Sequence, residues 1–190
     1  MSLYKTPPAE VHVICVDEMG PVSAKTYPTA RWSLRRPPLT PDYGRRAKVW
    51  VFGAFEPRTG QALTCCAPSR AATHFLTLLT RITEHWPGEV ILIMDNLASH
   101  KTLDVRLWAL AHPHVRFLFQ PTYAPWLNLI EPWWKTLRSL ALKGRRFEAA
   151  DELPSAISDA VSYWNAHRHP FVWGRRKRRR PARPTGIAHL

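Results

Sequence analysis

The chain has few cysteines, and it has no long apolar run. Its three cysteines are Cys15 and the neighbouring pair Cys65 and Cys66, a pattern that indicates neither a zinc site nor a disulfide framework. No apolar stretch approaches the ~20 residues of a membrane-spanning helix, and no signal-peptide pattern is present. These absences predict a soluble protein of a reducing, cytoplasmic compartment.

Acidic residues are also scarce, above all near the C-terminus. Lys and Arg total 27 against 14 Asp and Glu, which gives a net charge of +13. Eight of the bases and none of the acids follow Asp159, so the first 159 residues carry a net charge of only +5. With 190 residues, 45% of them hydrophobic, we expect one well-buried domain over residues 1–167 and a basic tail over 168–190. This charge predicts a polyanionic partner.

The clearest element in the sequence is a buried strand that ends in a carboxylate. Five apolar residues, 90–94, lie between a Pro-Gly turn and Asp95-Asn96, which is the pattern of a strand buried on both faces. Ligands bind at the carboxyl ends of strands in open α/β sheets, so Asp95 is a candidate site residue. An Asp-Asn pair in this place is also typical of a turn or a helix cap, and alone it decides nothing.

A second strand is predicted over residues 11–17, with apolar side chains on both faces. Alternation places Asp17 and Glu18 on opposite faces, so only one of them should share a site with Asp95, and the pattern leaves open which one. Turn and strand signals predict further strands around 22–27, after a turn at Gly20-Pro21, and over 48–55, 61–66 and 115–119.

Helical periodicity predicts helices over 69–86 with Ser69 as the N-cap, 102–111, 128–144 and 151–167. In the second of these, Leu103, Leu107 and Leu110 should face inward. Meandering strands followed by β-α-β units predict an α/β fold with one mixed sheet and helices on its faces. The Arg-rich stretch 31–46 should be an extended loop, which either tracks a phosphate backbone or is simply solvated.

Glu131 has two interpretations. Pro132 favours the first turn of a helix, which places Glu131 near the helix N-terminus. Glu131 is then either a structural residue, with Asn128 in a capping box and Lys135 in a salt bridge, or a third site carboxylate. Three converging carboxylates would supply the hard oxygen ligands that two Mg²⁺ ions need for phosphodiester cleavage, and their mutual repulsion should raise their pKa values.

Three motifs carry a family resemblance: VDE around Asp17, MDNLASHK at Asp95, and PTYAPWLNLIEPWW at Glu131, with 35 residues between the last two carboxylates. Together with FGAF, GRRF and YWNAHRHPF, they resemble the DDE transposases of insertion sequences related to the mariner group. The resemblance implies a ribonuclease H-like fold, with a mixed five-stranded sheet and helices on both faces. It also favours Asp17 over Glu18.

The implied activity is that of a transposase catalytic core, with Asp17, Asp95 and Glu131 as catalytic residues that bind two Mg²⁺ or Mn²⁺ ions. The expected reaction is hydrolysis at element ends, followed by attack of the freed 3′-hydroxyl on target DNA. Two rival hypotheses are a catalytically idle fragment that binds DNA nonspecifically and an enzyme that acts on RNA–DNA hybrids. The intact set of carboxylates and the family motifs favour the transposase core over both.

The implied partner is DNA, which would associate the protein with the nucleoid. The candidates to bind phosphates are Lys101, Lys135, Arg138, Arg175, Arg176, Lys177, Arg178, Arg179 and Arg180. The candidates to orient the carboxylates are Asn96, His100 and Asn128. Relatives carry a helix-turn-helix region that recognises element ends, and none fits before Val11, so we expect that region to be missing here. A homodimer is a further expectation.

Overall fold

The computed structural model describes residues 2–6, 8–27, 48–121, 125–149 and 151–171. Its centre is a mixed five-stranded sheet in the order β3-β2-β1-β4-β5. Strand β1 is antiparallel to β2 and parallel to β4, so it is central, as predicted. The strands are β1 (Val11–Ser23), β2 (Lys48–Glu56), β3 (Gln61–Ala67), β4 (Glu89–Met94) and β5 (Val115–Phe119).

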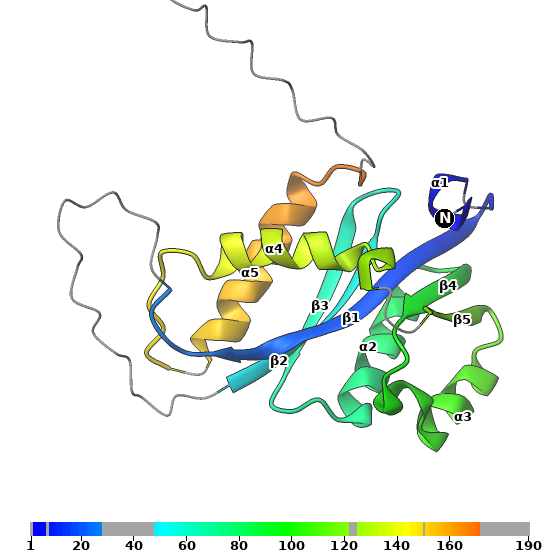
Figure 1. Cartoon of the computed structure of the whole chain (residues 1–190), viewed down its shortest axis with the longest axis horizontal. Helices are drawn as coiled ribbons and strands as arrows, with labels where there is room; N and C mark the ends of the chain where they lie inside the picture. The colour runs from blue at the N-terminus through cyan, green and yellow to red at the C-terminus, as the bar shows by residue number, and fades with distance from the viewer. Residues whose placement is uncertain (1, 7, 28–47, 122–124, 150, 172–190) are drawn as a thin grey trace, which may run out of the picture.

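Helices cover both faces of this sheet, with α4 and α5 on one side and α2 and α3 on the other (Figure 1). The core under α4 and α5 includes Cys15 and Met19, whereas the core under α2 includes Ile14 and Val16. Side chains along β1 therefore alternate between the two cores. The helices are α1 (Ser2–Lys5), α2 (Ala72–His85), α3 (Leu103–Ala111), α4 (Ile130–Ala141) and α5 (Glu152–Ala166), with 3₁₀ turns at Ala98–Lys101 and Pro125–Leu127.

The predicted turn at Gly20-Pro21 does not end the first strand. Strand β1 continues to Ser23, with an irregularity in its pairing to β2 between Met19 and Val22. Proline lacks an N–H for the ladder, and a bulge is where a strand tolerates it. The separate strand predicted around 22–27 is therefore wrong. Instead, residues 24–27 pair with 144–147, where the Tyr27 N–H donates to the Arg145 carbonyl at 2.8 Å.

Two helix predictions also need correction. Helix α2 begins three residues after Ser69, and Ala71 occupies its N-cap position without a side-chain hydrogen bond. In α3 the leucines expected to face inward are exposed, with fractions of 70% for Leu103, 54% for Leu107 and 78% for Leu110. This helix lies beside the edge strand β5 and buries Val105 instead. The packing of the neighbouring elements, and not the number of apolar residues on each face, therefore decides which face of α3 is buried.

The remaining elements follow the sequence closely. The β2–β3 hairpin, β4, β5, α4 and α5 lie where the patterns place them, with their bounds shifted by a few residues at most. Every helix in the described ranges is too short or too polar to cross a membrane. The Arg-rich stretch 31–46 and the six consecutive tail bases lie outside the described residues. The boundary at residue 167 stays a prediction, and the Phe171 N–H still donates to the Pro57 carbonyl at 2.8 Å.

Candidate active site

Asp17 lies on β1, and Asp95 directly follows the end of the neighbouring parallel strand β4. The parallel register pairs Cys15 of β1 with Ile93 of β4, and two residues further along lie Asp17 and Asp95. Asp17 shares the α4 side of the sheet with Cys15, because alternate residues of a strand face the same way. Glu131 lies exposed in the first turn of α4, and its charge acts on the Asp17 carboxyl, as does that of Asp95.

The Asp17 carboxyl is largely buried, and its proton affinity is unusually high. Burial raises the pKa of Asp17 to about 7, and the charges of Glu18, Glu131 and Asp95 also raise it. The Glu18 N–H donates to Asp17 Oδ1 at 2.8 Å and opposes this rise. The expected repulsion among carboxylates is therefore present at Asp17.

Asp95 behaves in the opposite way. Its side chain is 50% exposed, and Oδ1 lies 3.1 Å from His100 Nδ1 and accepts a 3.0 Å hydrogen bond from the Leu97 N–H. The hydrogen bond with His100 lowers the pKa of Asp95 below its ordinary value, despite partial burial. The prediction of a raised pKa is therefore wrong for Asp95, because the sequence pattern did not place a cation beside it.

His100 joins Asp95 to Glu18 inside the protein. The His100 Nε2 atom lies 2.8 Å from Glu18 Oε1, and both side chains are almost fully buried. Burial acts to lower the pKa of His100, but its hydrogen bonds to Asp95 and Glu18 and their charges raise it to about 9. His100 is therefore an imidazolium at neutral pH, held between two carboxylates.

This bridge corrects the expectation that only one of Asp17 and Glu18 shares a site with Asp95. The charge of Asp95 acts on Asp17, which lies on the α4 side of the sheet, and Glu18 reaches Asp95 through His100 from the α2 side. The position of Asp95 at a strand end, beyond the paired part of the sheet, makes it accessible from both faces. The signal in the sequence was His100 itself, five residues after Asp95 in the motif MDNLASHK.

The Asp17 carboxyl also contacts Trp134, whose ring packs against Gly53. The Trp134 indole Nε1 lies 3.4 Å from Asp17 Oδ2, and its ring lies over Gly53, the β2 partner of Asp17. A Cβ atom on Gly53 would lie only 2.2 Å from Trp134 Cη2. The absence of a side chain at Gly53 is therefore what allows the indole to reach Asp17, a role that the FGAF motif did not reveal.

The structural interpretation of Glu131 is wrong. Asn128 is buried: its amide donates to the Val16 carbonyl at 3.0 Å, and its Oδ1 accepts from the Ile130 N–H at 3.4 Å and not from Glu131, while Leu129 occupies the N-cap position without a side-chain bond. In the described part of the chain, no hydrogen bond or ion pair engages the Glu131 carboxylate, and Lys135 is not its partner. Glu131 is therefore available to a ligand.

The carboxylates of Asp17, Asp95 and Glu131 are suitable ligands for a hard cation, although they do not already surround one metal position. No three His, Cys, Asp or Glu side chains among the described residues already surround a common metal position. The three carboxylates nevertheless present oxygen ligands of the kind that Mg²⁺ prefers. The repulsion that raises the pKa of Asp17 is the interaction that a bound cation would relieve.

The described basic candidates have different surroundings. Lys101 Nζ donates to Asn96 Oδ1 at 2.7 Å and lies 4.9 Å from the centroid of the Phe119 ring. Lys135 is exposed on α4, and Arg138 Nε lies 3.0 Å from Met19 Sδ. Contact of these three residues with DNA stays a prediction, as it does for the tail bases.

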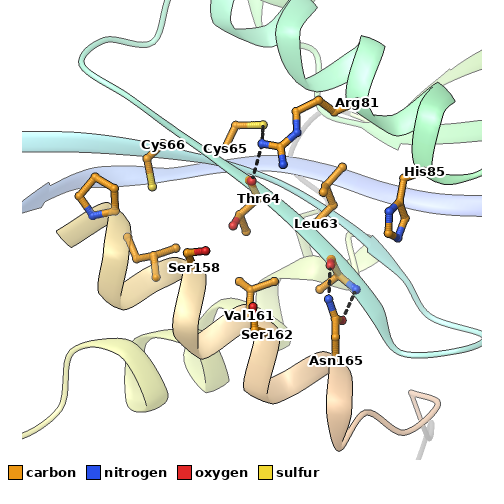
Figure 2. Close-up of a pocket in the computed structure, with 13 residues that line it drawn as sticks. Leu63, Thr64, Cys65, Cys66, Arg81, His85, Ser158, Val161, Ser162 and Asn165 are labelled. Atoms are coloured by element: carbon orange, nitrogen blue, oxygen red, sulfur yellow. Dashed lines mark hydrogen bonds between the residues drawn. The ribbon is translucent and has the colours of Figure 1, made fainter. Parts of the chain in front are cut away.

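A separate cavity of about 450 Å³ lies between β3, α2 and α5 (Figure 2). Arg81 crosses it to the Thr64 carbonyl at 3.2 Å, and the Asn165 amide pairs with both backbone groups of Ala62. These hydrogen bonds satisfy part of the outer edge of β3. None of the three site carboxylates lines this cavity.

A family model described as DDE superfamily endonuclease matches residues 12–154, a range that contains all three carboxylates. The chain belongs to this superfamily. An uncharacterized 39 kDa protein of insertion element IS630 from Shigella sonnei is 32% identical over 113 residues, 57% of this chain and 32% of that protein. The chain thus spans about a third of that relative's length.

Solved structures share the fold of this chain at low sequence identity. The Mos1 transposase, in a paired-end complex with the left transposon end, aligns with a TM-score of 0.63 at 18% identity, covering 90% of this chain and 52% of that chain. The catalytic core of BIV integrase aligns with a TM-score of 0.55 at 13% identity, covering 83% and 86%. The predicted ribonuclease H-like fold and the resemblance to mariner-related transposases are confirmed.

Proposed function

We propose that this chain is the catalytic core of an insertion-sequence transposase, which hydrolyses phosphodiester bonds at element ends and joins the freed 3′-hydroxyl to target DNA. The observation that carries the proposal is the placement of Asp17 on β1 and of Asp95 directly after the neighbouring strand β4, with Asp95 and Glu131 both close enough for their charges to act on Asp17. Membership of the DDE endonuclease superfamily supports this assignment.

Each carboxylate has a distinct role in the proposal. Asp95 is fixed through Oδ1 by His100 and by the Leu97 N–H, so its other oxygen remains for a ligand. Asp17 is buried and binds a proton near neutral pH, so it must lose that proton to bind a cation. Glu131 has no hydrogen-bond or ion-pair partner within the described ranges and completes the set from α4.

These residues would hold two Mg²⁺ or Mn²⁺ ions, which when bound activate the attacking water or hydroxyl and stabilise the leaving oxygen. Because Asp17 must release a proton on binding, metal affinity should rise with pH up to about 7 and level off above it. A similar fold, the catalytic core of HTLV-2 integrase, was solved in complex with magnesium and aligns with a TM-score of 0.52 at 10% identity, covering 80% of this chain and 82% of that chain.

Nicking of supercoiled plasmid DNA tests this function. The full chain should nick in Mg²⁺ and not in EDTA, and Asp17→Asn should abolish nicking. The matched control is Asp159→Asn, which removes an exposed carboxylate of α5 and should leave nicking intact. Equal nicking by the Asp17→Asn variant and the wild type would contradict the proposal and favour an idle, DNA-binding fragment.

DNA binding by the chain is expected to be nonspecific and carried largely by the tail. If all six bases from Arg175 to Arg180 contact phosphates, the log–log salt dependence of binding should have a slope of about −5 from the tail alone, at ~0.9 per contact. Removal of residues 174–190 should flatten that slope. An unchanged slope would assign the run of bases to another role.

A further inference from the structure

Helix α4 and strand β1 run side by side away from the site, and successive turns of the helix contact successive residues on one face of the strand. Contacts join Trp134 to Asp17 and then Arg138 to Met19, so four residues of helix match two of strand. Four helical residues advance ~6 Å and two strand residues ~6.6 Å, which explains the matched advance. Figure 1 shows the helix lying along the strand toward its Ser23 end.

At the far end of this pair, the two elements enclose a cavity of about 440 Å³. We call it the basic cleft, and its polar lining consists of Ser23, Lys25, Tyr27, Arg138, Ser139 and Lys143. It has three cations and no acidic side chain. In the ranges that the structure describes, no carboxylate lies within ion-pair distance of any of the three.

The walls of the basic cleft are held by backbone pairing. The Gly144 N–H donates to the Tyr27 carbonyl at 2.7 Å, and the Phe147 N–H donates to the Lys25 carbonyl at 3.4 Å. The Tyr27 hydroxyl donates to the Ser23 carbonyl at 2.8 Å, and Lys25 Nζ lies 5.4 Å from the centroid of the Tyr27 ring. Lys25 and Lys143 both line the cleft, and backbone hydrogen bonds that do not involve the cations hold their two segments together.

We infer that the basic cleft binds the phosphodiester backbone of the DNA substrate at a distance from the reacting phosphate. This inference rests on the proposed action on DNA. From Glu131 to Ala141 the helix advances ~15 Å, and Lys143 lies two residues beyond its end, so the cleft is about five phosphates from Glu131 along one strand of B-DNA at ~3.4 Å each. The cleft therefore contacts DNA about half a helical turn from the site and sets the direction in which the duplex leaves it.

The test is the salt dependence of binding to a 20-base-pair duplex, measured by fluorescence anisotropy in EDTA, where no cleavage occurs. Lys25→Ala/Lys143→Ala in the full chain should reduce the magnitude of the log–log slope by about 2, at ~0.9 per phosphate contact. The matched control, Arg106→Ala/Arg116→Ala, removes the same charge from α3 and the edge strand β5, neither of which lines the cleft, and should leave the slope unchanged. Lys25→Arg/Lys143→Arg should retain the wild-type slope.

The outcomes separate the cleft from the proposed function. A reduced slope confined to the cleft variant supports the inference, even if the wild type then fails to nick plasmid DNA in Mg²⁺, a result that would sink only the transposase activity. An unchanged slope, or an equal reduction in the cleft variant and the matched control, overturns the inference, whether or not the wild type nicks. Thermal unfolding of the same variants checks that the fold is intact.

Discussion

Asp17 on β1 and Asp95 just after the neighbouring strand β4 belong to the same site, yet their surroundings shift their pKa values in opposite directions. Asp17 is buried beside other carboxylates, and its pKa is raised to about 7. Asp95 is half-exposed and paired with the His100 imidazolium, which lowers its pKa. Asp95 is therefore stabilised as an anion in the absence of a ligand, whereas no cation compensates the charge of Asp17 in the described structure.

This difference indicates which part of the site is preformed. The Glu18–His100–Asp95 bridge has short contacts and buried partners, so it fixes Asp95 whether or not a cation is bound. Asp17 has one short hydrogen bond, from the Glu18 N–H, and one long contact with Trp134. We expect a cation to change the energy of Asp17 far more than that of Asp95.

The largest expected effect comes from breaking the bridge. His100→Ala leaves Glu18 as a buried, unpaired charge, a change that typically costs about 3–5 kcal/mol. Urea unfolding at pH 7 should show this loss, and the double variant Glu18→Gln/His100→Gln should recover more than half of it. A loss below about 1 kcal/mol would mean that the bridge does not hold Asp95.

The opposite pKa shifts of the two aspartates predict that replacing each carboxylate by an amide changes stability in opposite directions. Because the pKa of Asp17 is raised from 3.8 to about 7, the folded state binds its proton more tightly, and stability is lost as pH rises through that range. Asp17→Asn should therefore exceed the wild type in stability above pH 7, by roughly 2–4 kcal/mol, and match it near pH 4.

Asp95→Asn should do the reverse. The lowered pKa of Asp95 contributes stability above its ordinary pKa of 3.8, which is lost as pH falls, so its amide should be less stable at pH 7. The measurement is the free energy of unfolding at pH 4 and at pH 7.5 for both variants. Effects of the same sign would contradict the contrast between the two sites.

A smaller effect is expected at the contact that positions Asp17. Gly53→Ala places a Cβ against the Trp134 ring and should cost about 1–3 kcal/mol, as overpacking does. Trp134→Phe shortens the ring, so the double variant should lose less than the sum of the single losses. Additive losses in denaturant unfolding would show that Gly53 does not accommodate this indole.

The smallest change in stability is expected for Glu131→Gln. The carboxylate is exposed and has no partner among the described residues, so the free energy of unfolding should change by less than about 0.5 kcal/mol. Plasmid nicking should nevertheless be lost. Nicking at the wild-type rate would remove Glu131 from the site.

Much of the fold could be predicted because strand and helix periodicities match burial in the core. The buried strand before Asp95 and the helix after Asn128 are examples. The outward-facing leucines of α3 could not be predicted, because which stripe of an edge helix is buried depends on what packs beside it. The motifs located the three carboxylates, but a one-dimensional pattern does not show that His100 lies between Glu18 and Asp95, since that contact joins residues 82 positions apart.

The most direct test of the central claim is the stabilisation of the chain by Mn²⁺, measured as the change in free energy of unfolding for the wild type, Asp17→Asn, Asp95→Asn and Glu131→Gln. If the three carboxylates bind the metal together, the wild type should gain about 2.7 kcal/mol at a metal concentration of 100 times Kd. Each variant should lose most of that gain, Asp17→Asn included, despite its higher stability without metal. An equal gain in all four proteins would contradict a shared metal site at Asp17, Asp95 and Glu131.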